Sequence, residues 1–359
     1  MVSASTRSKT PTKKSKKNSS RATPSLSFID RLQSDAQKNE LEPSNTKPST
    51  FLFLCTCQTL LAYHSSVLID QSLNNSAHSF FLDSATVGLS IHWVGFAMSC
   101  LINSCFYFDI IEDAGLLYMF VRSYTSITTP TRRQTLVHAC ALLWGIRLLS
   151  FVGYRVIKRG QDFRFDKLIK SPAYNLFGWT SGGTWCWLNC FCVWTLAGNT
   201  FDTQDLTVLD CLGLCLFATG LFIETVSDVQ KYQFNADVSS GKHKKWISHG
   251  LWKWSRHPNY FGEITVWLGL AIVCVGGNNS VYFTRFTNDF RVAPLFIIFI
   301  SPLFSCFFLV FTSLMLLEKY ANQKWENSAQ WIKYKRKTPV LFPNRLPTWS
   351  EVVLQKEVS

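Results

Sequence analysis

The stretch "APLFIIFISPLFSCFFLVFTSLMLL", residues 293–317, decides the fold, because it carries no charged side chain over its whole length. A helix needs about 20 apolar residues to cross the hydrocarbon core of a bilayer. Seven more apolar blocks precede it, at 51–69, 87–105, 106–121, 135–153, 178–197, 206–226 and 260–276. The sequence therefore predicts an all-α, polytopic membrane bundle of about eight transmembrane helices. The count falls to seven if 106–121, which contains Asp109, Glu112 and Asp113, does not span.

Composition and charge distribution agree with a membrane protein. The chain is 47% hydrophobic and only 16% charged, whereas a soluble domain carries about 25% charged residues. The alternative, a large soluble helical protein, does not show apolar residues in such blocks. Lys and Arg, which give a net charge of +13, concentrate in residues 1–50 and in loops 154–170, 231–256 and 319–345. Loops 70–86 and 198–205 contain neither, so the positive-inside rule places both termini in the cytosol and no nucleic-acid partner is expected.

The chain divides into three parts. Residues 1–50 form a Ser/Thr/Lys-rich segment with no acidic residue before Asp30, which indicates either a disordered basic cytosolic tail or an organellar transit peptide. Residues 51–317 form the transmembrane helical domain, and 318–359 a cytosolic C-terminal helix and tail. The twelve cysteines lie within or at the ends of apolar blocks without metal-ligand spacing, so neither disulfides nor a metal site is predicted.

Ionisable side chains cluster where one apolar block begins, in "GLWKWSRHPNYFGEITVWLGL", residues 250–270. Proline favours the first position of a helix, so Pro258 is expected to start one. Asn259 and Glu263 then share a face, with Tyr260 beside them. Gly262 would allow close approach of a ligand or of another helix. A carboxyl one turn into a membrane suggests function.

This start of a helix also suits an anionic ligand. Its free amides and positive dipole end, together with Arg256 and His257, favour a group such as pyrophosphate. The alternative is that Arg256 and Glu263 merely anchor the helix at the membrane surface.

Two further polar stretches face the same side. In "GLFIETVSDVQKYQFNAD", 220–237, Glu224, Asp228 and Lys231 form one stripe. Lys231 could meet a phosphate and Asp228 a hydroxyl or an amide; the alternative is an internal ion pair between these two residues.

The last stretch, residues 316–343, carries Glu318 and Tyr334, which we predict to contact the cofactor. The alternative for this stretch is a basic amphipathic helix lying on anionic lipid. A water-soluble anionic cofactor entering from the cytosol would meet all three stretches, next to a substrate dissolved in the membrane.

These motifs resemble the steroid 5-alpha-reductase-like superfamily, in particular its membrane branch catalogued as a domain of unknown function. The resemblance is carried by "SRHPNYFGE", by "ETVSDVQKYQF" at 224–234 and by "GIRLLSFVGYRVIKRGQDFRFDKL" at 145–168. It covers about residues 140–343.

The resemblance implies an NADPH-dependent reductase of an activated carbon–carbon double bond in a steroid-like or other lipid. It also implies that Asp228, Asn259, Gly262 and Glu263 contact the cofactor. Arg256 and His257 match the Arg-His-Pro branch rather than the steroid reductases themselves. We expect Tyr260 and Glu263 to take part in catalysis, with Tyr154, Asp109 and Glu112 as further candidate donors to a substrate carbonyl. Phe165 stands where the family often has Tyr.

Two other functions stay open. Membrane methyltransferases acting on isoprenylcysteine or phospholipids share the Arg-His-Pro-x-Tyr-x-Gly core and use S-adenosylmethionine. A non-enzymatic scaffold or lipid-binding protein would have kept the fold alone. In every case the partners are membrane lipids, and the location is the endoplasmic reticulum or, given the acid-poor N-terminus, a plastid or other organelle membrane.

Overall fold

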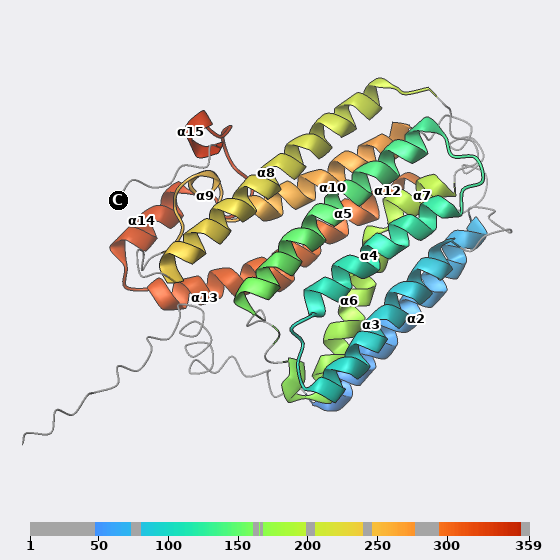
Figure 1. The fold of residues 1–359 in the computed structure, drawn as a ribbon, viewed down its shortest axis with the longest axis horizontal. Coiled ribbons are helices and arrows are strands. Elements are labelled where there is room, and N and C mark those ends of the chain that lie inside the picture. Colours follow the sequence, from blue (N-terminus) through green and yellow to red (C-terminus); the bar gives the residue numbers. More distant parts are fainter. Residues whose placement is uncertain are drawn as a thin grey trace, which may run out of the picture.

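The computed structural model describes residues 47–72, 80–160, 165, 168–198, 205–239, 246–276 and 294–352. The predicted tail at 1–50 lies almost entirely outside these ranges. The described residues form helices and no strands, which confirms an all-α architecture (Figure 1). The long helices are α2 (Pro48–Ser72), α3 (Phe80–Ile102), α4 (Phe108–Thr125), α5 (Arg132–Arg159), α6 (Pro172–Asn189), α8 (Val208–Ser239), α10 (Pro258–Gly276) and α12 (Pro294–Phe308).

Shorter elements connect and extend these helices. They are the 3₁₀ turn η2 (Leu168–Lys170), α7 (Phe191–Ala197), α9 (Leu251–Trp254), the π-helix η3 (Leu309–Leu314), α13 (Met315–Trp325), α14 (Ala329–Lys337) and α15 (Trp349–Val352). Helices α12, η3 and α13 follow one another without a break, so the predicted boundary between residues 317 and 318 falls inside a helix.

Six helices are long and apolar enough to cross a bilayer: 48–71, 81–102, 132–159, 208–239, 258–276 and 296–325. The chain is therefore an integral membrane protein. The two remaining predicted spans also form helices but fall outside these six. Helix α4, which covers most of the predicted span 106–121, carries the three acids that weakened its prediction. The stretch at 178–197 is divided into α6 and α7 at Cys190.

Helices α8 and α10 pack backbone to backbone, side by side in Figure 1. A Cβ atom added at Gly220 would lie 2.6 Å from the carbonyl oxygen of Gly262, and one added at Gly269 would lie 2.5 Å from the amide nitrogen of Phe217. Small residues permit such close approach between membrane helices. This contact brings the polar residues of α8 against those at the start of α10.

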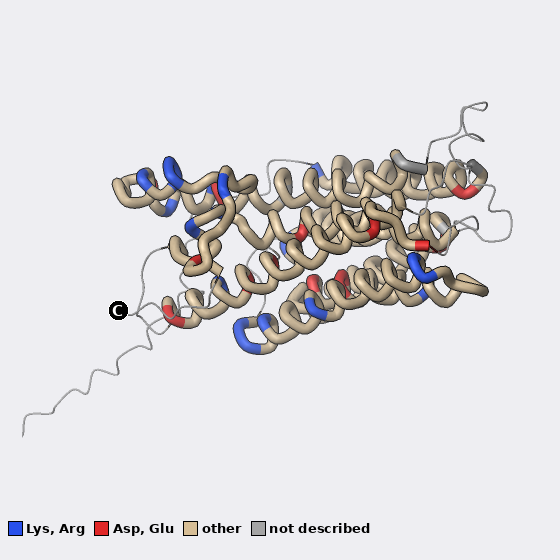
Figure 2. Tube along the Cα trace, turned by 90° about the horizontal axis from the view of Figure 1, so that it is seen from above, with Lys and Arg blue, Asp and Glu red and all other residues tan. Residues whose placement is uncertain are grey.

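Charged residues occur inside the bundle as well as at its ends (Figure 2). At the end where α5 and α8 begin, Arg133 and Asp210 form a fully buried pair with an Nε to Oδ1 distance of 2.7 Å. A second Arg133 nitrogen donates to Asp210 at 2.9 Å and also to the carbonyl oxygen of Asp205. These bonds offset the cost of burying the two charges. Toward the opposite end, where α10 begins, lie the buried residues Glu224, Asp228 and His257.

Candidate functional site

The candidate site begins where α10 begins. Pro258 is its first residue, as predicted, and the carbonyl oxygen of His257 accepts a hydrogen bond from the amide of Phe261. Asn259 and Glu263 therefore lie one turn apart on α10. Ser255 steers the chain into the helix, because its hydroxyl donates to the carbonyl oxygen of Leu341 at 2.8 Å.

A buried network of carboxylates and one guanidinium lies beside these two residues. Arg147 of α5 contacts Glu224 and also donates to Asp228, at 2.7 Å, both on α8. The indole of Trp144 donates to Glu224 at 2.9 Å. One Arg thus holds two buried acids in place, and buried charges need such pairing to persist in a helical bundle.

Asn259 and Glu263 extend this network from α10. The Asn259 side chain hydrogen-bonds to Asp228, while its amide oxygen is buried without a hydrogen-bond partner. Glu263 lies within electrostatic range of Glu224, Asp228 and Arg147, and no described residue donates a hydrogen bond to it. Three carboxyls face one guanidinium, and two acceptors on one face of α10 are open to a ligand that donates hydrogen bonds.

Lys231, one turn beyond Asp228, provides an uncompensated positive charge. Its ammonium lies 4.5 Å from the centre of the Trp252 ring, a favourable cation–π contact. Within the described part of the chain it makes no ion pair, since Asp228 pairs with Arg147 instead. The alternative of an internal Asp228–Lys231 pair is therefore wrong, and the ammonium stays available to an anion.

Glu318 holds Arg256 and His257 together. Its two carboxylate oxygens lie 2.9 Å from an Arg256 nitrogen and 2.9 Å from Nε2 of His257. Burial lowers the pKa of His257 below its usual 6.5, while the hydrogen bond to Glu318 opposes this shift. Arg256 is thus an ion-pair partner of Glu318 rather than a free anchor at the membrane surface. A Glu318 carboxylate would position these basic residues rather than contact a phosphate.

The other predicted site residues lie around this centre. Gly262 packs against the backbone of Glu224, so its small size serves the α8–α10 contact rather than ligand approach. The Tyr260 ring stacks on His257 and packs against the cluster that contains Leu309 and Leu314.

Two more predicted residues do not meet the network. Tyr334 donates its hydroxyl hydrogen to the carbonyl oxygen of Trp252 at 2.6 Å, and burial raises its pKa. Tyr154 is half exposed and packs on Tyr232. The ring of Phe165 stacks on Phe108.

Sequence reasoning did not assign Arg147 a role, although an Arg inside the apolar block 135–153 is a signal of function by itself. On α4 it named Asp109 and Glu112 as candidate donors to a substrate carbonyl but gave Asp113 no role. Asp109 pairs with Arg155 of α5. Asp113 is buried with one oxygen that has no hydrogen-bond partner, and it lies within electrostatic range of Glu263. The acids of the predicted weak span thus face the network.

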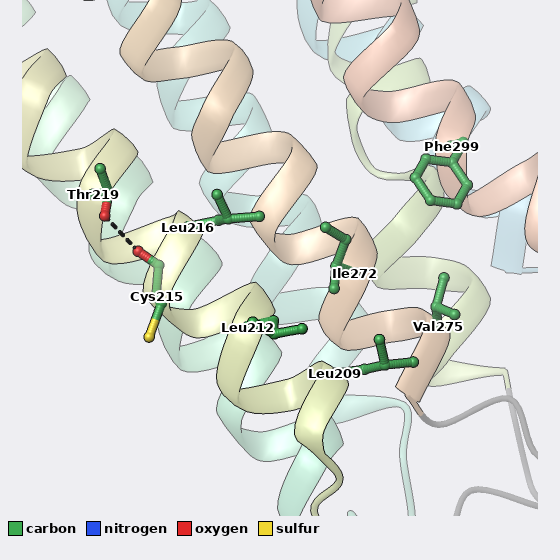
Figure 3. A pocket seen from close by; sticks show the side chains of 8 residues that line it. All are labelled: Leu209, Leu212, Cys215, Leu216, Thr219, Ile272, Val275 and Phe299. Atoms are coloured by element: carbon green, nitrogen blue, oxygen red, sulfur yellow. Dashed lines mark hydrogen bonds between the residues drawn. The ribbon is translucent and has the colours of Figure 1, made fainter. Parts of the chain in front are cut away.

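A separate apolar groove of about 500 Å³ lies on the outside of α8, α10 and α12 (Figure 3). It is lined by Leu209, Leu212, Cys215, Leu216, Thr219, Ile272, Val275 and Phe299. Its one hydroxyl, on Thr219, donates to the carbonyl oxygen of Cys215. With no charged side chain, this groove suits hydrocarbon and is not the chemical site. Among the described residues, no group of His, Cys, Asp and Glu side chains is arranged to hold a metal ion.

Comparison with known proteins gives one match. The sequence pattern of the family described as "Protein of unknown function (DUF1295)" matches residues 95–338, well over half of the chain. No curated protein and no solved structure matches the chain. The matched range contains Arg147, the Asp228 network, the start of α10 and Glu318. The chain therefore belongs to the DUF1295 family of proteins of unknown function.

Proposed function

We propose that this protein is a membrane-embedded, NADPH-dependent reductase of an activated carbon–carbon double bond in a steroid-like or other lipid. The observation that carries the proposal is that unpartnered hydrogen-bond acceptors and an unpaired ammonium lie close together at one end of the bundle. Open acceptors on Asn259 and Glu263 adjoin the Arg147 network, and the unpaired ammonium of Lys231 lies one turn along α8 from Asp228. The steroid 5-alpha-reductase-like resemblance of these motifs supports the same activity and an endoplasmic reticulum location.

The residues present fit such a cofactor in two respects. The buried, unpartnered amide oxygen of Asn259 and the Glu263 carboxyl suit a group with N–H donors, such as a carboxamide. Lys231 suits a phosphate, which attracts an ammonium without a competing carboxylate. When bound, NADPH supplies the hydride chemistry.

The chain itself would supply position and electrostatics. Arg147 keeps Glu224 and Asp228 fixed, and Asp228 in turn orients Asn259. Glu318 keeps Arg256 and His257 against α13. Glu263 is the proposed catalytic residue with a direct electrostatic link to this network, whereas the Tyr260 ring stacks on His257. The substrate would arrive from the bilayer, since the site lies within helices that are long and apolar enough to cross it.

The competing activity is S-adenosylmethionine-dependent methyl transfer, and thermal unfolding of the purified protein distinguishes the two. A ligand that binds only the folded state stabilises it by about 2.7 kcal/mol when present at 100 times its dissociation constant. We expect NADPH to raise the unfolding temperature and S-adenosylmethionine to leave it unchanged. Stabilisation by S-adenosylmethionine alone would assign the protein to the methyltransferases. Indifference to both ligands would favour the scaffold.

A further inference from the structure

The residues after the last candidate span form a lobe, 329–352, that is fastened to the loop before α10. The amide of Arg256 donates to the carbonyl oxygen of Pro339 at 2.9 Å. The Thr338 hydroxyl donates to the carbonyl oxygen of Lys253 at 3.2 Å. The Gln230 side chain on α8 bonds both the amide of Leu251 and the carbonyl oxygen of residue 351. An interaction that orders this C-terminal lobe should therefore also order residues 249–257, to which the lobe is hydrogen-bonded.

The lobe turns back toward the apolar part of the bundle. Leu341 is buried in a cluster with Ile264, Leu309 and Leu314, all of which belong to candidate membrane spans. The next residue, Phe342, has its ring 6.4 Å from that of Phe261 and is 60% exposed. The chain near residue 341 thus packs against residues of the membrane spans, at or near the edge of the hydrocarbon core.

The outer surface of the lobe exposes large apolar side chains, which is unfavourable for a surface that faces only water. Leu346 is 85% exposed and Trp349 is 81% exposed, in addition to Phe342. Exposed apolar groups gathered in one short segment mark an interaction surface, and Trp is enriched at the membrane–water boundary. Helix α15, which carries Trp349, is held rigidly. Two hydrogen bonds from Arg345 keep the pKa of Glu351 at about 2, so this pair stays charged at neutral pH.

Exposed positive charges accompany these apolar groups. Lys333, Arg336 and Lys337 are exposed on α14, and Figure 2 shows Lys and Arg gathered at this end of the molecule. Basic residues beside an anionic leaflet each contribute about 1 kcal/mol of attraction. The combination of basic residues and inserted apolar groups is that of an interfacial membrane anchor.

We propose that the C-terminal lobe docks onto the anionic leaflet bordering this end of the bundle, with Phe342, Leu346 and Trp349 among the headgroups and Lys333, Arg336 and Lys337 against their phosphates. Docking orders the loop that carries Arg256 and His257, so the charge of the surrounding lipid controls how rigid the candidate site is. This control is separate from the proposed reductase activity and holds for any function of the site. The continuity of the lobe with the membrane spans favours the leaflet as its partner over a second protein.

Hydrogen exchange of the full chain in lipid nanodiscs holding one copy each tests this proposal without any cofactor. One set of discs contains phosphatidylcholine alone, and the other contains about one-third phosphatidylglycerol, whose negative charge provides the attraction. We expect amides in 338–349 and 249–257 to exchange at least about threefold more slowly in the anionic discs. The triple substitution Lys333→Gln, Arg336→Gln, Lys337→Gln should remove this difference.

A second triple variant, Phe342→Ser, Leu346→Ser, Trp349→Ser, should speed exchange of the lobe in both kinds of disc. As a folding control, amides in α8 and α10 of each variant should exchange at the wild-type rate. Leu206→Ser, which alters a half-exposed leucine outside the lobe, is the matched control and should behave as wild type. Equal exchange of the wild type in the two lipids would overturn the proposal. So would protection that appears only when two copies share a disc, because a second chain would then cover the lobe.

Discussion

Glu318 shows how one carboxylate can organise a basic site. One of its oxygens forms an ion pair with Arg256 and the other accepts a hydrogen bond from Nε2 of His257, so this one carboxylate restrains two consecutive side chains. Charge-assisted hydrogen bonds of this kind are roughly twice as strong as neutral ones. The neighbouring Lys231 has no such partner within the described residues. Of the three basic side chains, Lys231 is therefore the one most able to respond to an incoming anion.

The protonation of His257 should give the protein a pH dependence. Its folded pKa lies below the ordinary 6.5, so the unfolded chain binds the proton more tightly. Stability therefore rises with pH through this range and is lost as the pH falls below about 6.5. We expect the unfolding temperature of the wild type to fall more between about pH 8 and pH 5 than that of His257→Gln. Parallel curves for the two proteins would show that His257 does not contribute.

Sequence reasoning located the α10 residues well and the α5 residues poorly. Asn259 and Glu263 are four positions apart, so helical periodicity alone puts them on one face. Arg147 lies 81 positions from Asp228, and only the packing of α5 on α8 brings the two together. Tyr260 is adjacent to Asn259 in sequence, but its ring turns to His257. Local spacing predicts which residues share a helix face, not which distant helix that face meets.

At the level of elements, the α8–α10 contact is the most constrained part of the fold. Gly213 and Gly220 on α8 face Gly269 and Gly262 on α10, with the same seven-residue spacing in both helices. A spacing of seven residues keeps the two small positions on one face. From the sequence, Gly262 could allow close approach of either a ligand or another helix. Close packing of α8 against α10 explains the glycine at all four of these positions.

Alanine at one of these glycines should therefore destabilise the bundle. Its Cβ at position 269 would meet the Phe217 backbone at 2.5 Å, which cannot yield without separating the helices. Overpacking of this kind costs about 1–3 kcal/mol, so Gly269→Ala should lower the unfolding temperature. Gly153 on α5 is the control, because an added Cβ there meets nothing within 4 Å. Gly153→Ala should be neutral or stabilising by up to about 1 kcal/mol; equal losses for the two variants would contradict the packing account.

The predicted spans were most accurate where apolar character is uniform and least accurate where tertiary packing intervenes. Residues 294–317 of the uncharged stretch lie in one continuous helix, as expected, but this helix contains a π-helical segment at Leu309–Leu314 that the sequence pattern did not predict. The stretch 178–197 is apolar enough to predict a span but breaks at Cys190. Its α7 part is buried among other helices, so its apolar residues serve the protein core rather than lipid.

On the scale of the whole molecule, the candidate polar site and the apolar groove lie toward opposite ends of α8. The Asp228 network, Lys231 and the C-terminal lobe lie where α10 begins, and the apolar groove lies toward the beginning of α8. This division fits a protein that meets a water-soluble partner at one membrane face and hydrocarbon elsewhere. The placement of both termini in the cytosol remains a prediction, since residues 1–46 lie outside the described ranges.

The central claim is that Asn259 and its network bind NADPH, and a binding isotherm of the purified protein tests it most directly. Asn259→Ala removes the hydrogen bond to Asp228 and the open amide oxygen, so we expect affinity to fall about fivefold or more. Lys231→Ala should also weaken binding, because its half-buried ammonium would lose its contact with the cofactor phosphate. Lys253→Ala, which changes an exposed side chain on α9, should leave affinity unchanged. No NADPH binding by the wild type, or an equal loss for Lys253→Ala and Asn259→Ala, would contradict the account.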